Sequence, residues 1–158
     1  MSRRNPKLPG RKPLKAFTDA NTLVSGLLFE GNEATLLELG RVGAVKLQTN
    51  RYVLSEASAV LRRREFQLTP EEIEGLTRYL HSCTSVTEDP PDEEILSNLH
   101  TLNDPKDIPV ALGAKEAGAD YLVTGDKELL KAQLIPTITT KRLLQLILQD
   151  DHDNGQRP

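Results

Sequence analysis

Short apolar runs alternate with longer segments of helical periodicity along this chain of 158 residues. Residues 14–18 form one apolar run, which ends at Asp19, and residues 121–123 form another, which ends in Thr124-Gly125-Asp126. Runs of this length that are bounded by Gly, Asp or Asn are typical of buried strands. Further strands are predicted at residues 45–49, 85–87 and 134–140.

The spacing of apolar positions between these strands predicts helices. Asn50 can cap the helix after the second strand, and Thr69-Pro70-Glu71-Glu72 is a capping box with proline at the first helical position. Pro109 disfavours helical geometry at Ile108, so we expect an irregular first turn there. Strands that alternate with helices predict an α/β fold, with parallel strands and helices on both faces of the sheet. The predicted helices span residues 33–41, 51–64, 70–82, 95–101, 108–117, 127–130 and 141–149.

Charge divides the chain into a domain and two tails. The first sixteen residues hold six of the 20 basic residues and none of the 23 acidic ones. We expect a disordered basic tail over residues 1–13, one domain over residues 14–148 and a disordered tail over residues 149–158. The basic tail is either a solvated extension or a contact to nucleic-acid phosphates. Because no apolar run approaches the ~20 residues of a membrane span and Cys83 is the single cysteine, we expect a soluble, cytoplasmic protein.

Acidic residues stand at positions where a purely structural role explains them poorly. Asp19 and Asp126 each follow a predicted strand, and ligands of open α/β sheets bind at the carboxyl ends of the strands. Glu56 lies within the apolar stripe of its predicted helix, where an unpaired charge is unfavourable. It could reach water at the edge of the stripe, or pair with Arg63 two turns further on. Helix capping explains one aspartate in the segment 103–107, but less easily two.

Four segments of the chain stand out: Asp19-Ala-Asn21-Thr22-Leu-Val-Ser25, Val60-Leu61-Arg62-Arg63, Asp104-Pro-Lys-Asp107 and Leu122-Val-Thr124-Gly-Asp126. In their order and spacing, these segments resemble the PIN-domain family, in particular the VapC-like toxins of toxin–antitoxin systems. The resemblance covers about residues 14–148 and implies a three-layer α/β/α, Rossmann-like fold with a central parallel sheet of four to five strands. It also implies a metal-dependent ribonuclease.

By position, the family's catalytic acids fall on Asp19, Glu56, Asp107 and Asp126. Carboxylates without His or Cys suit hard cations, so we expect Mg²⁺ or Mn²⁺. Asp19 and Asp126 are predicted as direct ligands, while Glu56 and Asp107 would bind through water or orient the attacking water. Asn21 and Thr124 match the polar residues that support the site, and Asp104 could share the role of Asp107.

Arg62 and Arg63 belong to the densest basic cluster of the predicted domain, at residues 62–64. The cluster is a solvated helix end, a phosphate clamp for RNA, or a contact for an acidic segment of an antitoxin. We expect an RNA substrate, a cognate antitoxin and a homodimer. Two other functions stay open: a non-catalytic scaffold that binds RNA or protein, and an aspartate-nucleophile phosphatase. The phosphatase is disfavoured because Asn21 stands where such enzymes carry their second aspartate.

Overall fold

A parallel sheet forms the centre of the computed structural model, which describes residues 12–156 and, within these, the side chains of residues 12–149. Its five strands are arranged in the order β3-β2-β1-β4-β5, and every neighbouring pair is parallel. The strands are β1 (Lys15–Thr18), β2 (Lys46–Thr49), β3 (Ser85–Val86), β4 (Tyr121–Val123) and β5 (Thr137–Ile138). The predicted α/β fold with four to five parallel strands is therefore confirmed.

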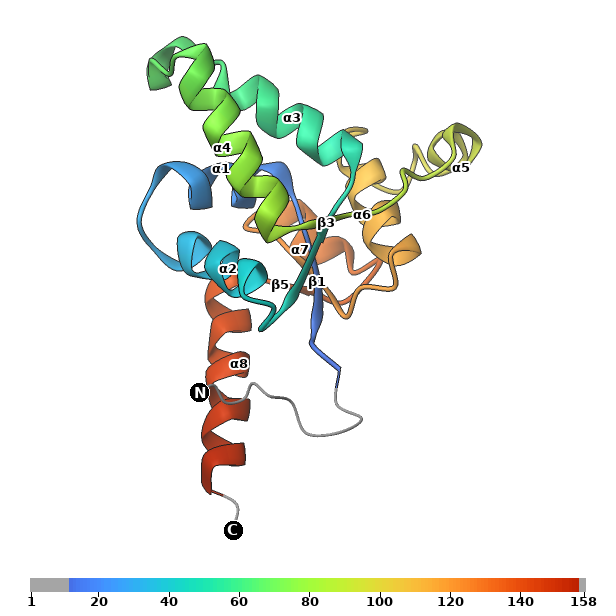
Figure 1. Cartoon of the computed structure of the whole chain (residues 1–158). Coiled ribbons are helices and arrows are strands. Elements are labelled where there is room, and N and C mark those ends of the chain that lie inside the picture. Colours follow the sequence, from blue (N-terminus) through green and yellow to red (C-terminus); the bar gives the residue numbers. More distant parts are fainter. Residues whose placement is uncertain (1–11, 157–158) are drawn as a thin grey trace.

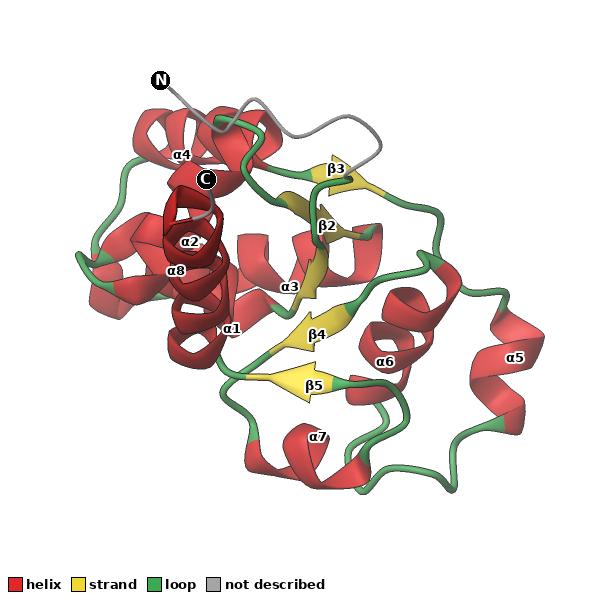
Figure 2. Cartoon of the chain, turned by 90° about the horizontal axis from the view of Figure 1, so that it is seen from below, coloured by secondary structure: helices red, strands yellow, loops and turns green. Residues whose placement is uncertain are grey.

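Helices cover both faces of the sheet (Figure 1). Figure 2 shows α1, α2, α4 and α8 on one side of the strands and α6, with α5 beyond it, on the other. Helix α3 contacts α1, α4 and α6. The helices are α1 (Ala20–Leu28), α2 (Asn32–Arg41), α3 (Arg51–Leu61), α4 (Pro70–Cys83), α5 (Asp92–Ser97), α6 (Asp107–Glu116), α7 (Lys127–Ala132) and α8 (Thr140–Gln156), with a 3₁₀ turn at Arg64–Phe66. This is the predicted three-layer α/β/α arrangement.

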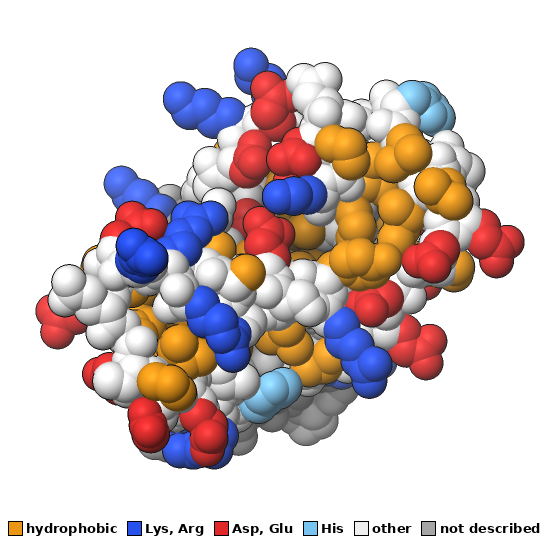
Figure 3. All heavy atoms as spheres, turned by 90° about the horizontal axis from the view of Figure 1, so that it is seen from above, with side chains coloured by type: hydrophobic (Ala, Val, Ile, Leu, Met, Phe, Trp, Pro, Cys, Tyr) orange, Lys and Arg blue, Asp and Glu red, His pale blue; other side chains and the backbone are white. Residues whose placement is uncertain are grey.

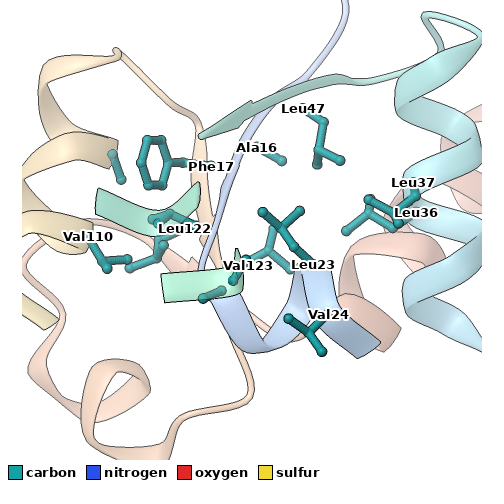
Figure 4. Packing of buried hydrophobic residues seen from close by; sticks show 14 of the residues in the cluster. Ala16, Phe17, Leu23, Val24, Leu36, Leu37, Leu47, Val110, Leu122 and Val123 are labelled. Atoms are coloured by element: carbon teal, nitrogen blue, oxygen red, sulfur yellow. The ribbon is translucent and has the colours of Figure 1, made fainter. Parts of the chain in front are cut away.

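The hydrophobic core lies on both sides of β1, because successive side chains of a strand point to opposite faces. Phe17 packs toward Val110 of α6 and Leu122 of β4, and all three are buried (Figure 4). Ala16 faces the other way, toward Leu47 and the helices of the opposite layer. Strand β1 is thus enclosed by apolar side chains on both faces, and Asp19, which follows it, lies at the carboxyl edge.

Helix α1 is absent from the sequence prediction. It contains the β-branched residues Thr22 and Val24 and also Gly26, which weaken the helical signal. Tertiary packing decides the helix instead. A Cβ atom on Gly26 would lie 2.7 Å from Leu37 Cδ1 and 2.8 Å from the carbonyl oxygen of Glu33, so glycine lets α1 pack tightly against α2.

Several predicted boundaries are wrong. Helix α3 ends at Leu61, three residues before the predicted end, and the 3₁₀ turn follows it. Helix α5 begins after Pro91 and ends at Ser97, earlier than predicted. Helix α8 continues to Gln156, so most of the tail predicted for residues 149–158 is helical; no proline or glycine interrupts it before Gly155. Residues 1–11 of the predicted basic tail lie outside the described residues.

The expectation for Pro109 is also wrong. Pro109 is the third residue of α6, and the first turn of that helix is regular. Proline is tolerated there because the first four N–H groups of a helix have no intrahelical acceptor. The two predicted caps are confirmed: Asn50 accepts from the N–H of Val53, and Thr69 and Glu72 form the reciprocal capping box. Within residues 12–156, no helix combines the length and apolarity needed to cross a membrane.

Candidate functional site at the carboxyl edge of the sheet

Asp19 is the N-cap of α1, directly after β1. Its Oδ1 atom accepts a hydrogen bond from the N–H of Thr22 at 2.9 Å. Only 8% of the residue is exposed, which is low for a carboxylate. Because β1 is the central strand, Asp19 lies in the middle of the carboxyl edge.

Thr124 links Asp19 to Asp126. Its hydroxyl donates to Asp19 Oδ2 and accepts from the N–H of Asp126 at 3.0 Å, and the residue is fully buried. Asp126 in turn caps α7, where its Oδ1 accepts from the N–H groups of Glu128 at 2.8 Å and Leu129 at 3.4 Å. The pairing of β1 with β4 brings residues 105 positions apart into this arrangement. Among the described residues, Asp126 Oδ2 has no hydrogen-bond partner.

Asp107, the first residue of α6, lies close to the other carboxylates. Its pKa is raised from 3.8 to about 6, first by burial and then by the negative charges of Asp126, Asp104, Glu56 and Asp19, in that order. Burial and like charges both disfavour the ionised form. The structure therefore brings the other three predicted acids within electrostatic range of Asp107.

Asp104 lies on the loop that leads into α6. Its Oδ1 accepts from the N–H of Lys106 at 3.0 Å, and its carbonyl oxygen accepts from the N–H of Asp107 at 3.0 Å. Asn103 on the same loop donates to Glu128 at 2.8 Å and so ties the loop to α7. Asp104 is exposed and Asp107 is half-buried, so Asp104 contributes charge from the rim of the site.

Glu56 is exposed on α3, beside the buried residues Val53, Ala57 and Val60. The interpretation that it reaches water at the edge of the stripe is confirmed. The pairing with Arg63 is not: α3 ends at Leu61, and the described part of the chain shows no ion pair between the two side chains. Glu56 is still close enough to Asp107 to raise its pKa.

The remaining predicted residues lie on the surface. Asn21, in the first turn of α1, is exposed. Arg62 folds back and donates to the hydroxyl and, at 3.3 Å, to the carbonyl oxygen of Ser58. Arg63 directly precedes the 3₁₀ turn and has an extended backbone. Its side chain is exposed, and no described side chain forms an ion pair with it. Figure 3 views the molecule from the side at which β1 ends; acidic side chains gather there between basic side chains and an apolar surface.

The donor set at this edge fits a hard cation bound mainly through water. Among the described residues, no three Asp, Glu, His or Cys side chains form a ready-made metal-binding group. Mg²⁺ usually keeps several waters and takes only one or two protein carboxylates. Asp19 and Asp126, joined through Thr124, could supply these. The crowding that raises the pKa of Asp107 would be relieved by a divalent cation.

A separate cavity of about 300 Å³ lies at the opposite end of the sheet. Its lining includes Pro13, Val45 and Ser85, which precede or begin strands β1, β2 and β3, and none of the four acids. The four acids lie instead toward the carboxyl edge of the sheet. Sequence reasoning treated one residue of this edge, Asn50, only as a helix cap; its place directly after β2 parallels that of Asp19 after β1.

Comparison with solved structures supports the fold. The protein PAE2754 from Pyrobaculum aerophilum has a TM-score of 0.64 at 23% sequence identity, and the match covers 86% of this chain and 96% of that chain. VapBC2 from Rickettsia felis, solved with a DNA fragment from its promoter, has a TM-score of 0.61 at 16% identity; the match covers 80% of this chain and 98% of the matched chain. A search of curated proteins gives no match.

The protein is thus an α/β protein with a parallel sheet and acidic residues gathered at the carboxyl edge of that sheet. The sequence profile of the PIN domain matches residues 15–128, which contain Asp19, Glu56, Asp107 and Asp126. The chain belongs to the PIN-domain family.

Proposed function

We propose that this protein is a metal-dependent endoribonuclease whose site is the carboxyl edge described above. The observation that carries the proposal is the gathering of acidic residues around Asp107: burial raises its pKa, and the negative charges of Asp126, Asp104, Glu56 and Asp19 raise it further. Repulsion between these negative charges destabilises the metal-free protein, and a bound divalent cation would offset this repulsion. A carboxylate with a perturbed pKa, as at Asp107, is also typical of functional sites.

Each residue has a role that follows from its surroundings. Asp19 and Asp126 would hold Mg²⁺ or Mn²⁺, because Thr124 and the N-termini of α1 and α7 fix their side chains. When bound, the metal would stabilise charge on the phosphoryl oxygens and assist ionisation of water. Asp107 on α6 and Glu56 on α3 would bind the metal through water or orient the attacking water. Asn21 and Asp104 would support the site from its rim.

The substrate and partners are proposed on more general grounds. Arg63 is exposed at the end of the helix that carries Glu56, so Arg63, with Arg62 beside it, could contact RNA phosphates. The similarity to VapBC2 supports a toxin role with a cognate antitoxin, and we propose a homodimer in the cytoplasm. A small neighbouring gene for a DNA-binding protein would support the toxin role over general RNA processing.

The test is cleavage of an end-labelled RNA by the parent protein and by Asp19→Asn and Asp126→Asn, with Mn²⁺, with Mg²⁺ and with EDTA. Both substitutions keep the side-chain shape and remove one negative charge. We expect cleavage by the parent to need the metal, and each variant to lose roughly 10²-fold or more in rate. Melting curves with and without Mn²⁺ should show a larger metal-induced rise for the parent than for either variant.

The outcomes separate the alternatives. Full activity in both variants would contradict the proposed mechanism. A parent protein that binds RNA without cutting it would indicate a non-catalytic scaffold, and turnover of a small phosphomonoester would indicate a phosphatase. Loss of folding in the variants would show that the two aspartates are structural caps.

A further inference from the structure

We propose that Asn50 is a positioning residue that holds the two helices carrying Glu56 and Asp107 at the proper separation across the acidic edge. Asn50 is fully buried at the end of β2. Its Oδ1 atom accepts from the N–H of Val53 at 3.0 Å, in the first turn of α3. Its Nδ2 atom donates to the carbonyl oxygen of Pro109 at 3.3 Å, in the first turn of α6.

The side-chain amide of Asn50 thus joins two helices: its oxygen accepts a hydrogen bond from α3, and its nitrogen donates one to α6. Glu56 lies one turn beyond Val53 on α3, and Asp107 lies two residues before Pro109 on α6. Because proline fixes its own φ angle, the first turn of α6 that offers this carbonyl is stiff. A shift of the amide would therefore move the start of α6, and Asp107 with it, relative to α3.

Gly113 provides the space that this contact needs. A Cβ atom at Gly113 would lie 2.3 Å from Asn50 Nδ2 and 3.0 Å from Phe17 Cζ. Gly113 is one turn along α6 from Pro109, and it is buried. Without a side chain there, α6 approaches the sheet closely enough to accept the amide.

Helix capping alone does not require an asparagine. An N-cap needs only an acceptor, and serine or aspartate would serve α3 equally well. The buried donor to α6 is the property that an amide adds at this position. Outer partners that orient the residues of a metal site typically change metal affinity by 10–100-fold. The inference rests on the proposed function, because it takes the acidic edge to bind Mn²⁺ or Mg²⁺.

Asn50→Ser is the decisive variant, because serine keeps the cap oxygen and loses the reach to Pro109. Mn²⁺ affinity is measured on the full chain by electron paramagnetic resonance of free Mn²⁺, beside the melting temperature of the metal-free protein. We expect a cooperative melt and an Mn²⁺ affinity that is weaker by roughly 10-fold. A merely structural role would lower the melting temperature and leave the affinity of the folded protein unchanged.

Gly113→Ala tests the same contact from the other side. Its added methyl group should displace the amide and weaken Mn²⁺ binding in the parent, yet weaken it little further in the Asn50→Ser background. Thr69→Ala is the matched control: it removes the cap of α4, should lower the melting temperature and should leave Mn²⁺ affinity unchanged.

Equal Mn²⁺ affinity in folded Asn50→Ser and in the parent would overturn the inference while leaving the proposed function intact. If Asn50→Ser does not fold, Gly113→Ala takes its place: an Mn²⁺ affinity equal to that of the parent would overturn the inference. A parent without measurable Mn²⁺ binding would instead refute metal dependence, and the positioning role with it.

Discussion

Replacing Asp107 by asparagine should stabilise the metal-free protein at neutral pH. A pKa raised from 3.8 to about 6 corresponds to roughly 3 kcal/mol of unfavourable free energy for the ionised carboxylate in the folded state. Asp107 is only half-buried, so solvent screening reduces this to about 1.5 kcal/mol. The variant also loses the favourable interaction of a negative charge with the N-terminus of α6, which costs about 0.5 kcal/mol. The net gain is about 1 kcal/mol, or about 2–4 °C in Tm.

The gain should depend on pH in a defined direction. Between pH 3.8 and about 6 the folded protein holds the Asp107 proton more tightly than the unfolded chain does, so rising pH lowers the stability of the parent relative to the variant. The advantage of Asp107→Asn should therefore be small near pH 4, grow up to about pH 6 and stay constant above it. Urea unfolding in EDTA at pH 4.5, 6 and 8 measures the difference.

Asp104→Asn is the matched variant, because asparagine can still accept from the N–H of Lys106 and the site is exposed. It should stabilise the protein less than Asp107→Asn does. With saturating Mn²⁺ the parent should gain more stability than Asp107→Asn, because only the parent keeps the full cluster. An advantage at pH 8 no larger than that at pH 4.5 would refute the reasoning, as would a parent more stable than Asp107→Asn in EDTA at pH 8.

Substitutions at three further positions test single residues. Thr124→Val leaves Asp19 Oδ2 and the N–H of Asp126 without their shared partner, so unfolding free energy should fall by about 1–3 kcal/mol in urea titrations, whereas Thr124→Ser should retain most of it. Glu56→Gln should lower the rate of RNA cleavage with little change in Tm, because the side chain is exposed; unchanged cleavage would remove Glu56 from the site. Gly40→Ala places a Cβ atom 2.5 Å from the carbonyl oxygen of Cys83 and should cost about 1–3 kcal/mol; an unchanged Tm would contradict this packing.

Features that depend on near neighbours in the chain were predictable. The capping box at Thr69 and the cap at Asn50 each involve residues within three positions, so the local pattern suffices to find them. The same holds for the ends of β1 and β4, where Asp19 and Asp126 follow apolar runs. Parallel strands present their carboxyl ends at one edge, and this rule placed the two aspartates on the same side of the sheet.

Features that depend on packing were not predictable. Helix α1 carries a weak helical signal, and it is held by packing against α2, α3 and α4. The end of α3 at Leu61 decides that Arg63 does not share a helical face with Glu56. Neither the presence of α1 nor the end of α3 follows from residue spacing, because helical spacing applies only where a helix exists and continues.

The sequence by itself determined that Asp19 and Asp126 follow the ends of β1 and β4, because the end of a strand is a property of a short segment. Only the tertiary structure decided how those residues meet. Thr124 reaches Asp19 across 105 positions because β4 lies beside β1, and Asn50 reaches Pro109 across 59 positions because Gly113 leaves room for it. The raised pKa of Asp107 has the same origin: it combines burial with the charges of several segments, and both are set by packing.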